Sequence, residues 1–372
     1  QLGRFMFFMG QSDRGIGKIE SALQVAEALG LPEVMSEALN TKGLMLTARA
    51  RPEEGLALIR HSLTVALDND VSVSAQRAYF NLSNLLYYRD EYDEALRYAD
   101  AGLALSRRFG ERDWEWQFLA NTVAIHYWIG RWDDALTTAE DIPRLEEIPA
   151  ARFASVELLL ALPPLFIARG QIAEARKVVD SFEAFAGSAD EQERSSYFAG
   201  LGIVLRGEGN TEEALEVCEK VVFEPGLGES FAGRKLAVAE AFDAAVTLGA
   251  WKRAETLRAF LQNLPAGASP PYNPAQMARF DAIIKAHEGS PETENSFKRA
   301  VGAFREIQTP FRLGVTILEY AEWLAEAGRP DEASVLIDEA DGIFTRLSAE
   351  PWVKRAAGVL SGWHSPMSSS SG

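Results

Sequence analysis

Apolar side chains recur at helical spacing along most of the chain. In the segment 78–109, a first apolar stripe is followed by a short polar stretch and then by a second stripe. The first stripe comprises Ala78, Leu82, Leu85 and Leu86, and the second comprises Tyr92, Ala95, Leu96, Ala99 and Leu103. Two amphipathic helices joined by a turn form a helical hairpin. The pattern therefore predicts an αα-hairpin in this segment.

The hairpin pattern recurs with a period of 39–40 residues. Each unit has one turn position, usually a glycine: Gly10, Ala50, Asp90, Gly130, Gly170, Gly209, Gly249, Gly289 and Gly328. Five residues after the turn comes a small residue, except at Glu294: Gly15, Gly55, Ala95, Ala135, Ala175, Ala214, Ala254 and Ala333. Glycine supplies the positive φ that ends a helix, and a small side chain lets two helices cross closely. A fixed period of this length predicts an all-α, right-handed superhelical solenoid of about eight to nine helical hairpins.

Two segments rich in proline and glycine interrupt the array, at residues 224–229 and 264–274, and both are typical of loops. We therefore expect an N-terminal sub-array at residues 1–223 and a C-terminal sub-array at residues 224–363. The serine-rich end, residues 364–372, is expected to be a disordered tail. The chain does not begin with Met, and few residues precede Gly10, so we expect a fragment of a longer protein.

The net negative charge of the chain makes anionic binding partners unfavourable. The chain carries a formal charge of −17 and has a sequence pI of about 4.8. Nucleic acids and anionic membranes are bound by clusters of Lys and Arg, which the chain lacks, so neither is an expected partner. No apolar run reaches the length of about 18 residues that a membrane span needs, and Pro163-Pro164 interrupt the longest one. The single cysteine, Cys218, fits a cytoplasmic protein without internal disulfides.

The sequence contains no recognisable catalytic or metal-binding motif. The segment Gly15-Ile16-Gly17-Lys18 is the nearest approach to a phosphate-binding loop, but it lacks the first glycine and the hydroxyl residue. A zinc site needs three or four converging ligands. The four histidines of the chain are far apart in the sequence, at His61, His126, His287 and His364. We therefore expect no cofactor, no metal and no enzymatic activity.

The hairpins resemble tetratricopeptide repeats. A small residue lies seven positions before the turn in several units, as in the first helix of that family: Gly3, Gly43, Ser83, Gly202 and Ala321. The period is longer than the usual value of about 34 residues, so the helices or loops are extended. Repeats of this length are similar to those of bacterial signalling ATPases, in which a helical sensor array follows the ATPase core.

Three segments carry a closer resemblance. Residues 311–352, 107–114 and 130–136 are similar to the C-terminal region of multidomain actinobacterial-type proteins, in which nucleotide-cyclase and ATPase domains precede the repeats. The resemblance spans nearly the whole chain, but it rests on packing motifs. It implies a regulatory or sensor array whose partners include N-terminal domains of the same polypeptide. No cyclase or ATPase residues are present, so neither activity is implied for this chain.

A candidate binding site follows from the tetratricopeptide resemblance, which implies that first helices line a concave groove. The third and fourth hairpins place polar and aromatic residues on that face: Arg77, Asn81, Asn84, Tyr88, Gln117, Asn121 and Trp128. Asparagine is a poor helix former, and its amide can clamp the backbone of an extended peptide. Alternatively, the polar residues make hydrogen bonds between helices and the aromatic residues belong to the core. Both interpretations remain open at this point.

The leading hypothesis is a non-catalytic array that binds a protein or peptide in its groove, as the regulatory or sensor part of a larger bacterial signalling ATPase or cyclase. An acidic array favours a partner with net positive charge. A second hypothesis is the peptide-pheromone receptor array of a transcriptional regulator. A third, an enzyme with a helical-toroid fold, has no catalytic constellation to support it.

Overall fold

The computed structural model describes residues 12–143, 155–227, 231–265 and 269–361, together with Leu2 and Met6. Within these ranges the regular structure is entirely helical, and it confirms the predicted solenoid of helical hairpins. The first helices of the hairpins are α3 (Pro32–Ala48), α5 (Ser72–Tyr88), α7 (Arg112–Trp128), α9 (Ser155–Ala168), α11 (Glu191–Gly207), α13 (Phe231–Thr247), α15 (Tyr272–His287), α17 (Pro310–Glu326) and α19 (Glu350–Ser361).

The second helices alternate with the first along the chain. They are α2 (Ser12–Leu29), α4 (Pro52–Asp68), α6 (Tyr92–Phe109), α8 (Trp132–Glu140), α10 (Ile172–Asp180), α12 (Thr211–Phe223), α14 (Trp251–Gln262), α16 (Thr293–Glu306) and α18 (Pro330–Leu347). A short 3₁₀ helix, η2 (Glu183–Gly187), follows α10. No helix in the described ranges is both long enough and apolar enough to cross a bilayer.

The turn positions have the backbone conformation that the repeat predicts. From Ala50 to Gly328, all eight have positive φ, between 58° and 90°, while Gly10 lies outside the described residues. A second series of left-handed residues, which the sequence analysis missed, follows the second helices: Gly30, Asp70, Gly110, Gln308 and Ser348. Only two of these five are glycines, so composition gave a weaker signal for them.

The small positions lie at close helix crossings, as expected. A methyl group on Gly55 would lie 2.6 Å from the carbonyl oxygen of Gly43, so the backbones of α3 and α4 approach directly. At Gly202 the atom that an added methyl group would meet is the side-chain sulfur of Cys218. Ser83, Ala135 and the other described alanines of the series are buried.

The exception at Glu294 has a structural explanation. The other second helices begin two residues after the turn position, but α16 begins at Thr293, four residues after Gly289. This later start moves the crossing to Ser296, which is fully buried. Glu294 is instead partly exposed and forms an ion pair with Arg329 (2.7 Å) of the next turn.

The predicted loop at residues 264–274 is too long at its C-terminal end. Helix α15 already begins at Tyr272, whose side chain is fully buried and whose backbone N–H donates to Asp90 (2.7 Å). Tertiary contacts therefore fix residues that local composition assigned to a loop. At the other connector, residues 224–227 form a turn and α12 packs against α13 across it. The division into sub-arrays at residue 224 stays a prediction, and the predicted tail lies outside the described residues.

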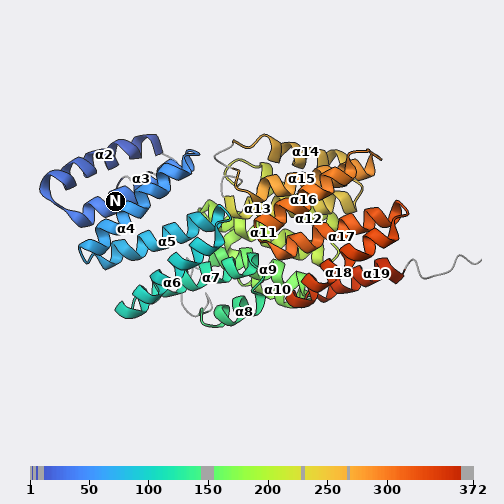
Figure 1. Cartoon of the computed structure of the whole chain (residues 1–372). Coiled ribbons are helices and arrows are strands. Elements are labelled where there is room, and N and C mark those ends of the chain that lie inside the picture. Colours follow the sequence, from blue (N-terminus) through green and yellow to red (C-terminus); the bar gives the residue numbers. More distant parts are fainter. Residues whose placement is uncertain are drawn as a thin grey trace, which may run out of the picture.

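The hairpins wind into a superhelix that contacts itself. The turn positions Asp90, Gly130 and Gly170 meet the N-terminal ends of α15, α17 and α19, respectively, at Tyr272, Pro310 and Pro351. Each pair is separated by about 180 residues, so one superhelical turn spans about four and a half hairpins. Figure 1 shows the result: α2–α6 extend as an arm from a compact body that contains α11–α19.

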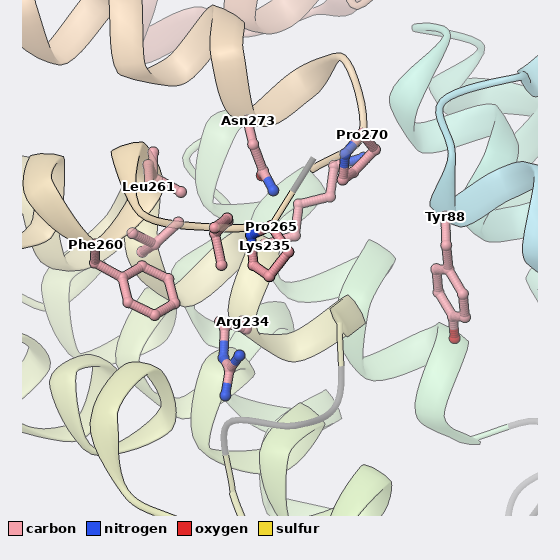
Figure 2. Close-up of a pocket in the computed structure, with 10 residues that line it drawn as sticks. Tyr88, Arg234, Lys235, Phe260, Leu261, Pro265, Pro270 and Asn273 are labelled. Atoms are coloured by element: carbon pink, nitrogen blue, oxygen red, sulfur yellow. The ribbon is translucent and has the colours of Figure 1, made fainter. Parts of the chain in front are cut away.

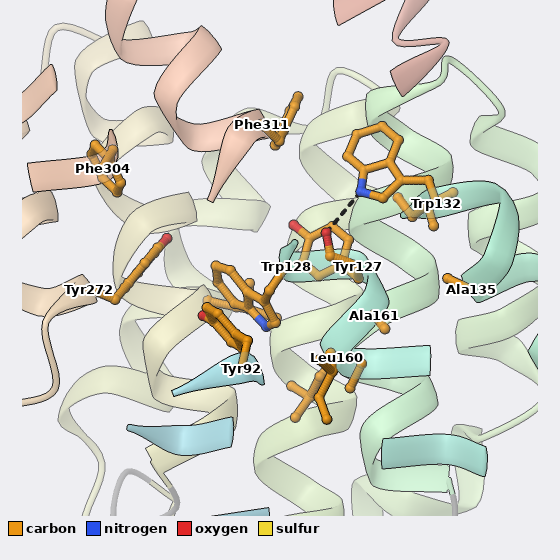
Figure 3. Close-up of a cluster of buried hydrophobic side chains, with 14 of the residues drawn as sticks. Tyr92, Tyr127, Trp128, Trp132, Ala135, Leu160, Ala161, Tyr272, Phe304 and Phe311 are labelled. Atoms are coloured by element: carbon orange, nitrogen blue, oxygen red, sulfur yellow. Dashed lines mark hydrogen bonds between the residues drawn. The ribbon is translucent and has the colours of Figure 1, made fainter. Parts of the chain in front are cut away.

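A single aromatic cluster joins the two superhelical turns. Trp128 lies 4.9 Å from Tyr272 between ring centroids, and Trp132 lies 5.3 Å from Phe311. These side chains come from α7, α8, α15 and α17 and lie close together in one hydrophobic cluster (Figure 3). The contact therefore buries apolar area from segments far apart in sequence, and this burial stabilises the closed form.

Replacing Ala135 with Leu is expected to destabilise the protein. Ala135 is fully buried on α8, at the position where this helix crosses a neighbour. Added methylene groups force side chains and backbone apart, at a cost of about 1–3 kcal/mol. Thermal unfolding followed by circular dichroism measures the effect. An unchanged melting temperature would show that the crossing tolerates a large side chain.

Candidate functional site

The first helices form the inner layer of the superhelix. In the N-terminal part, α3 contacts α5, α5 contacts α7, and α7 contacts α9. Polar side chains on these helices therefore come within reach of their counterparts one repeat away. The residues of the candidate groove all lie on α5 and α7.

Arg77 and Asn81 connect α5 to α3. The guanidinium of Arg77 is buried, forms an ion pair with Glu37, and donates to the hydroxyl of Thr41 (3.0 Å). The amide of Asn81 donates to the side chain of Asn40 (2.6 Å), and Asn81 keeps part of its side chain exposed. One polar ladder therefore holds the inner faces of α3 and α5 in register.

Asn84 and Asn121 continue this ladder towards α9. The amide of Asn84 donates to Asn121 (3.3 Å) on α7 and to the carboxyl of Glu157 (3.1 Å) on α9. Asn121 is fully buried and donates to the hydroxyl of Ser83 (3.4 Å) on α5. Asn84 therefore bridges three consecutive first helices.

Glu157 is a buried carboxyl group, and no ion pair to it is formed within the described residues. Burial disfavours its charged form and raises its pKa to about 7, and the hydrogen bond from Asn84 only partly offsets this. Because the pKa in the folded state exceeds that of the unfolded chain, the group contributes stability at low pH. That contribution is lost as the pH rises through about 7.

Replacing Glu157 with Gln is therefore expected to change how stability depends on pH. Between pH 5 and pH 8 the free energy of unfolding of the wild type should fall relative to that of the variant, by an amount approaching about 3 kcal/mol. Urea unfolding at a series of pH values measures this difference. If the difference between the two proteins were independent of pH, Glu157 would not titrate in this range.

The remaining candidate residues have different surroundings. Trp128 is buried, and its indole N–H donates to the hydroxyl of Tyr87 (3.1 Å). Gln117 is partly exposed and donates to the carbonyl oxygen of Asp113 (3.3 Å) on its own helix. Tyr88, at the end of α5, is partly exposed and lines a cavity.

The contacts of these residues agree with the interpretation as inter-helix hydrogen bonds and core aromatics, above all for Asn121 and Trp128. Four of the candidates nevertheless keep part of their side chains exposed: Asn81, Asn84, Tyr88 and Gln117. Their role in binding stays a prediction.

The sequence analysis did not identify Lys235, which has the most unusual surroundings of any lysine in the described ranges. Its side chain is buried on α13, where the ammonium group pairs with Asp90 and lies over the faces of three aromatic rings. The distances from Nζ to the ring centroids are 4.0 Å for Trp128, 4.6 Å for Tyr272 and 5.7 Å for Tyr92. We call this group the Lys235 clasp. Burial lowers the pKa of Lys235, and Asp90 opposes the shift.

A cavity of about 130 Å³ adjoins the Lys235 clasp. Its wall is largely apolar, with Val238, Phe260, Leu261, Leu264 and the prolines at 265 and 270, and its polar groups come from Tyr88, Arg234, Lys235 and Asn273. In Figure 2, Tyr88 lies on the opposite side from Phe260 and Leu261. The cavity therefore lies between the end of α5 and the connector that precedes α15.

Buried ion pairs occupy the inner layer of the second superhelical turn. Arg279 on α15 bonds to Glu319 on α17 (2.7 Å) and to Asp243 on α13 (2.7 Å). Two further arginines bond to Glu240 on α13: Arg206 at 2.6 Å and Arg312 at 3.2 Å. Burial alone would raise the pKa of Asp243, but the surrounding arginines hold it below its usual value.

This network carries a repeat signal that the sequence analysis overlooked. Asp243, Arg279 and Glu319 follow one another at intervals close to the repeat period, on consecutive first helices. Charges of opposite sign that recur at the repeat period indicate contacts between neighbouring units. The inner layer is therefore filled by ion pairs in the body of the protein, while amides dominate it in the N-terminal arm.

The described residues include no group of three or more His, Cys, Asp or Glu side chains arranged to hold a metal ion. In the second superhelical turn the buried carboxylates Glu240, Asp243 and Glu319 are paired with arginines, which provide the charge compensation that a cation would otherwise supply.

The chain was compared with curated proteins and with solved structures. A search of the curated proteins gives no match. Among solved structures, the chain is similar to a "circular tandem repeat protein with novel repeat topology and enhanced subunit contact surfaces", with 14% identity and a TM-score of 0.26, covering 97% of this chain and 92% of that one.

The family comparison matches one unit. Residues 77–108, which contain most of α5 and α6, match the tetratricopeptide repeat model. Repeats of this family generally mediate protein–protein interactions and are typically non-catalytic. The chain is thus an all-α array of helical hairpins in which residues 77–108 match the tetratricopeptide repeat model.

Proposed function

We propose that this chain is a non-catalytic binding array that holds an extended peptide segment of a partner protein on the inner face of the first helices α5 and α7. The proposal rests on one observation. Asn81, Asn84 and Gln117 lie on the adjacent first helices α5 and α7 and are only partly buried, whereas the inner layer of the body is filled by its own ion pairs. An amide offers a donor and an acceptor together, which suits a peptide backbone.

The spacing of these helices supports an extended ligand. Helices that pack against each other lie about 8–10 Å apart, and an extended chain advances about 3.3 Å per residue. Amides on neighbouring first helices can therefore contact every third residue of the peptide. Tyr88 provides an aromatic contact at the end of this face, next to the cavity.

The larger context of the array is part of the same proposal. The similarity of residues 311–352 to the ends of multidomain bacterial proteins supports a regulatory or sensor role in a cytoplasmic signalling ATPase or cyclase. In that setting the bound segment belongs to a partner or to an N-terminal domain of the same polypeptide. The net charge of −17 favours a segment rich in Lys and Arg.

Selection from a phage-displayed peptide library tests the binding function. The selected peptides should be basic, and calorimetry should show several-fold weaker binding to the Asn81→Ala, Gln117→Ala double variant. Gln24→Ala, which removes an exposed amide from α2, is the matched control and should bind like the wild type. Equal affinity of all three proteins would place the binding site elsewhere.

A further inference from the structure

The superhelix shows how the two edges of the array can pack against each other. We call the edge formed by the turns inside hairpins, such as Gly130 and Gly170, the inner-turn edge. The edge formed by the connections between hairpins is the connector edge. Within the chain, the inner-turn edge of α7–α10 packs on the connector edge of α16–α19. A methyl group on Gly130 would lie 2.5 Å from Pro310 and 3.1 Å from Leu347.

This contact buries one repeat position on the connector edge. Leu347 precedes the left-handed residue Ser348 at the end of α18, and only 3% of it is exposed. Arg169, beside Gly170, donates to the carbonyl oxygen of Leu347 (3.0 Å) and so adds a polar contact. An apolar side chain at this position is therefore covered when an inner-turn edge lies on it.

The same position is uncovered in the N-terminal arm. Leu29 precedes Gly30 and is 68% exposed, and Phe109 precedes Gly110 and is 51% exposed. The guanidinium of the exposed Arg108 lies over the ring of Phe109, at 5.5 Å from its centroid, whereas Arg112 in the same connector forms an ion pair with Glu115 (2.9 Å). The connector edge of the arm therefore offers an exposed aromatic residue flanked by Arg108.

On the inner-turn edge of the body, the turns at Gly209 and Gly249 are also uncovered. A methyl group added at Gly209 or Gly249 would meet no atom within 4 Å, whereas one at Gly130 or Gly170 would contact a proline. Leu248 is 41% exposed, whereas Ile129, its counterpart before Gly130, packs against the central cluster.

An open depression of about 460 Å³ lies on this edge. It is lined by Gly209, Asn210, Thr211, Glu212, Glu213 and Leu248. Both glutamates are exposed, and Glu212 forms an ion pair with Arg253 (3.4 Å), so Glu213 is the carboxylate that the depression offers beside the apolar Leu248.

We propose that these two edges bind each other between copies of this chain. The connector between α6 and α7 of one copy, with Phe109, docks into the depression between the α11–α12 and α13–α14 turns of a second copy. The contact repeats between molecules the edge-to-edge packing that already occurs within one molecule, and it brings Arg108 of one copy towards Glu213 of the other. Because the two surfaces differ, the contact is head-to-tail, and it forms chains or a ring rather than only dimers.

Analytical ultracentrifugation of the full chain over a range of concentrations tests this proposal. The weight-average mass of the wild type should rise with concentration beyond that of a dimer. Phe109→Asp and Leu248→Asp should each abolish the rise, because each removes one of the two surfaces. Val335→Asp is the matched control, since it replaces an exposed valine on the middle of α18, and it should associate like the wild type.

Mixing the two monomeric variants identifies the head-to-tail geometry. Phe109→Asp keeps the depression intact and Leu248→Asp keeps Phe109, so the mixture should form a 1:1 heterodimer and no larger species. Exchanging charges adds a second criterion: Arg108→Glu and Glu213→Arg should each weaken association, and mixing the two should restore it.

Three outcomes would overturn the proposal. The first is a wild type that stays monomeric at all concentrations. The second is undiminished association of Leu248→Asp, which would mean a contact between two identical edges. The third is loss of association in Val335→Asp, which would show that any added charge has this effect. Circular dichroism of each variant establishes that the helices are retained.

Discussion

Replacing Asp90 with Gly is expected to destabilise the protein strongly, although glycine is the usual residue at this repeat position. The carboxylate of Asp90 pairs with the buried ammonium of Lys235 and accepts the backbone N–H of Tyr272 (2.7 Å). Removing one member of a buried ion pair costs about 3–5 kcal/mol, because the other charge is left without compensation. Asp90 has a φ of 65°, which strains any residue other than glycine, so the glycine itself should stabilise the fold by about 1 kcal/mol and offset part of this loss.

Ala50→Gly is the matched control for this substitution. Ala50 occupies the equivalent turn position with a φ of 58°, and its methyl side chain cannot form an ion pair. This substitution should therefore raise the free energy of unfolding by about 1 kcal/mol. Urea unfolding followed by circular dichroism measures both variants. Similar shifts of the same sign in the two would contradict a stabilising role for the Lys235 clasp.

A second variant distinguishes loss of the ion pair from loss of packing. Adding Lys235→Met to Asp90→Gly removes the buried charge and leaves an apolar side chain among Trp128, Tyr272 and Tyr92. Because an apolar replacement of a buried ion pair is often neutral, the double variant should recover most of the lost stability. If it were as unstable as the single variant, the main role of Asp90 would be the hydrogen bond to α15.

Replacing Arg279 with Leu should have an effect of similar size. This guanidinium is 3% exposed and bonds to carboxylates on α13 and α17 at once. Without it, Asp243 and Glu319 remain buried with too little positive charge, at a cost of about 3–5 kcal/mol. The pKa of Asp243 should then rise, so the loss of stability should be smaller at low pH, where the carboxyl is protonated.

Arg176→Leu is the control for this prediction, because Arg176 makes two hydrogen bonds to Glu208 (2.8 and 2.6 Å) at the surface. Exposed ion pairs contribute about 0–1 kcal/mol, so this variant should unfold close to the wild type. Equal losses for the two substitutions would show that burial does not decide the strength of these pairs. Thermal and urea unfolding at several pH values make the comparison.

Local interactions determined much of the hairpin geometry, so the sequence was sufficient to predict it. The turn positions needed a left-handed residue, and glycine or aspartate at a fixed period revealed them. Small residues such as Gly43 and Gly55 marked the crossings because any side chain there meets backbone. The departure at Glu294 followed from a helix that starts two residues later, which no propensity of Ser290 or Pro291 indicated.

The candidate groove was predicted less completely. The resemblance to tetratricopeptide repeats implied that Arg77, Asn81 and Asn121 lie on the inner faces of first helices, and all three do contact the neighbouring first helix. The sequence could not show which of these side chains form hydrogen bonds to neighbouring helices. That depends on Glu37, Asn40 and Ser83, which become partners only when consecutive first helices pack together.

The sequence by itself determined the repeat, the hairpin and the layer to which each helix belongs, because these depend on contacts within one period. Only the tertiary structure decided how the array closes. Asp90 meets Lys235 and Tyr272, and Gly130 meets Pro310, because small rotations between hairpins add up to a full superhelical turn. The total rotation cannot be derived from the sequence of any single hairpin. The exposure of Phe109 and the burial of Leu347 at the same repeat position follow from it alone.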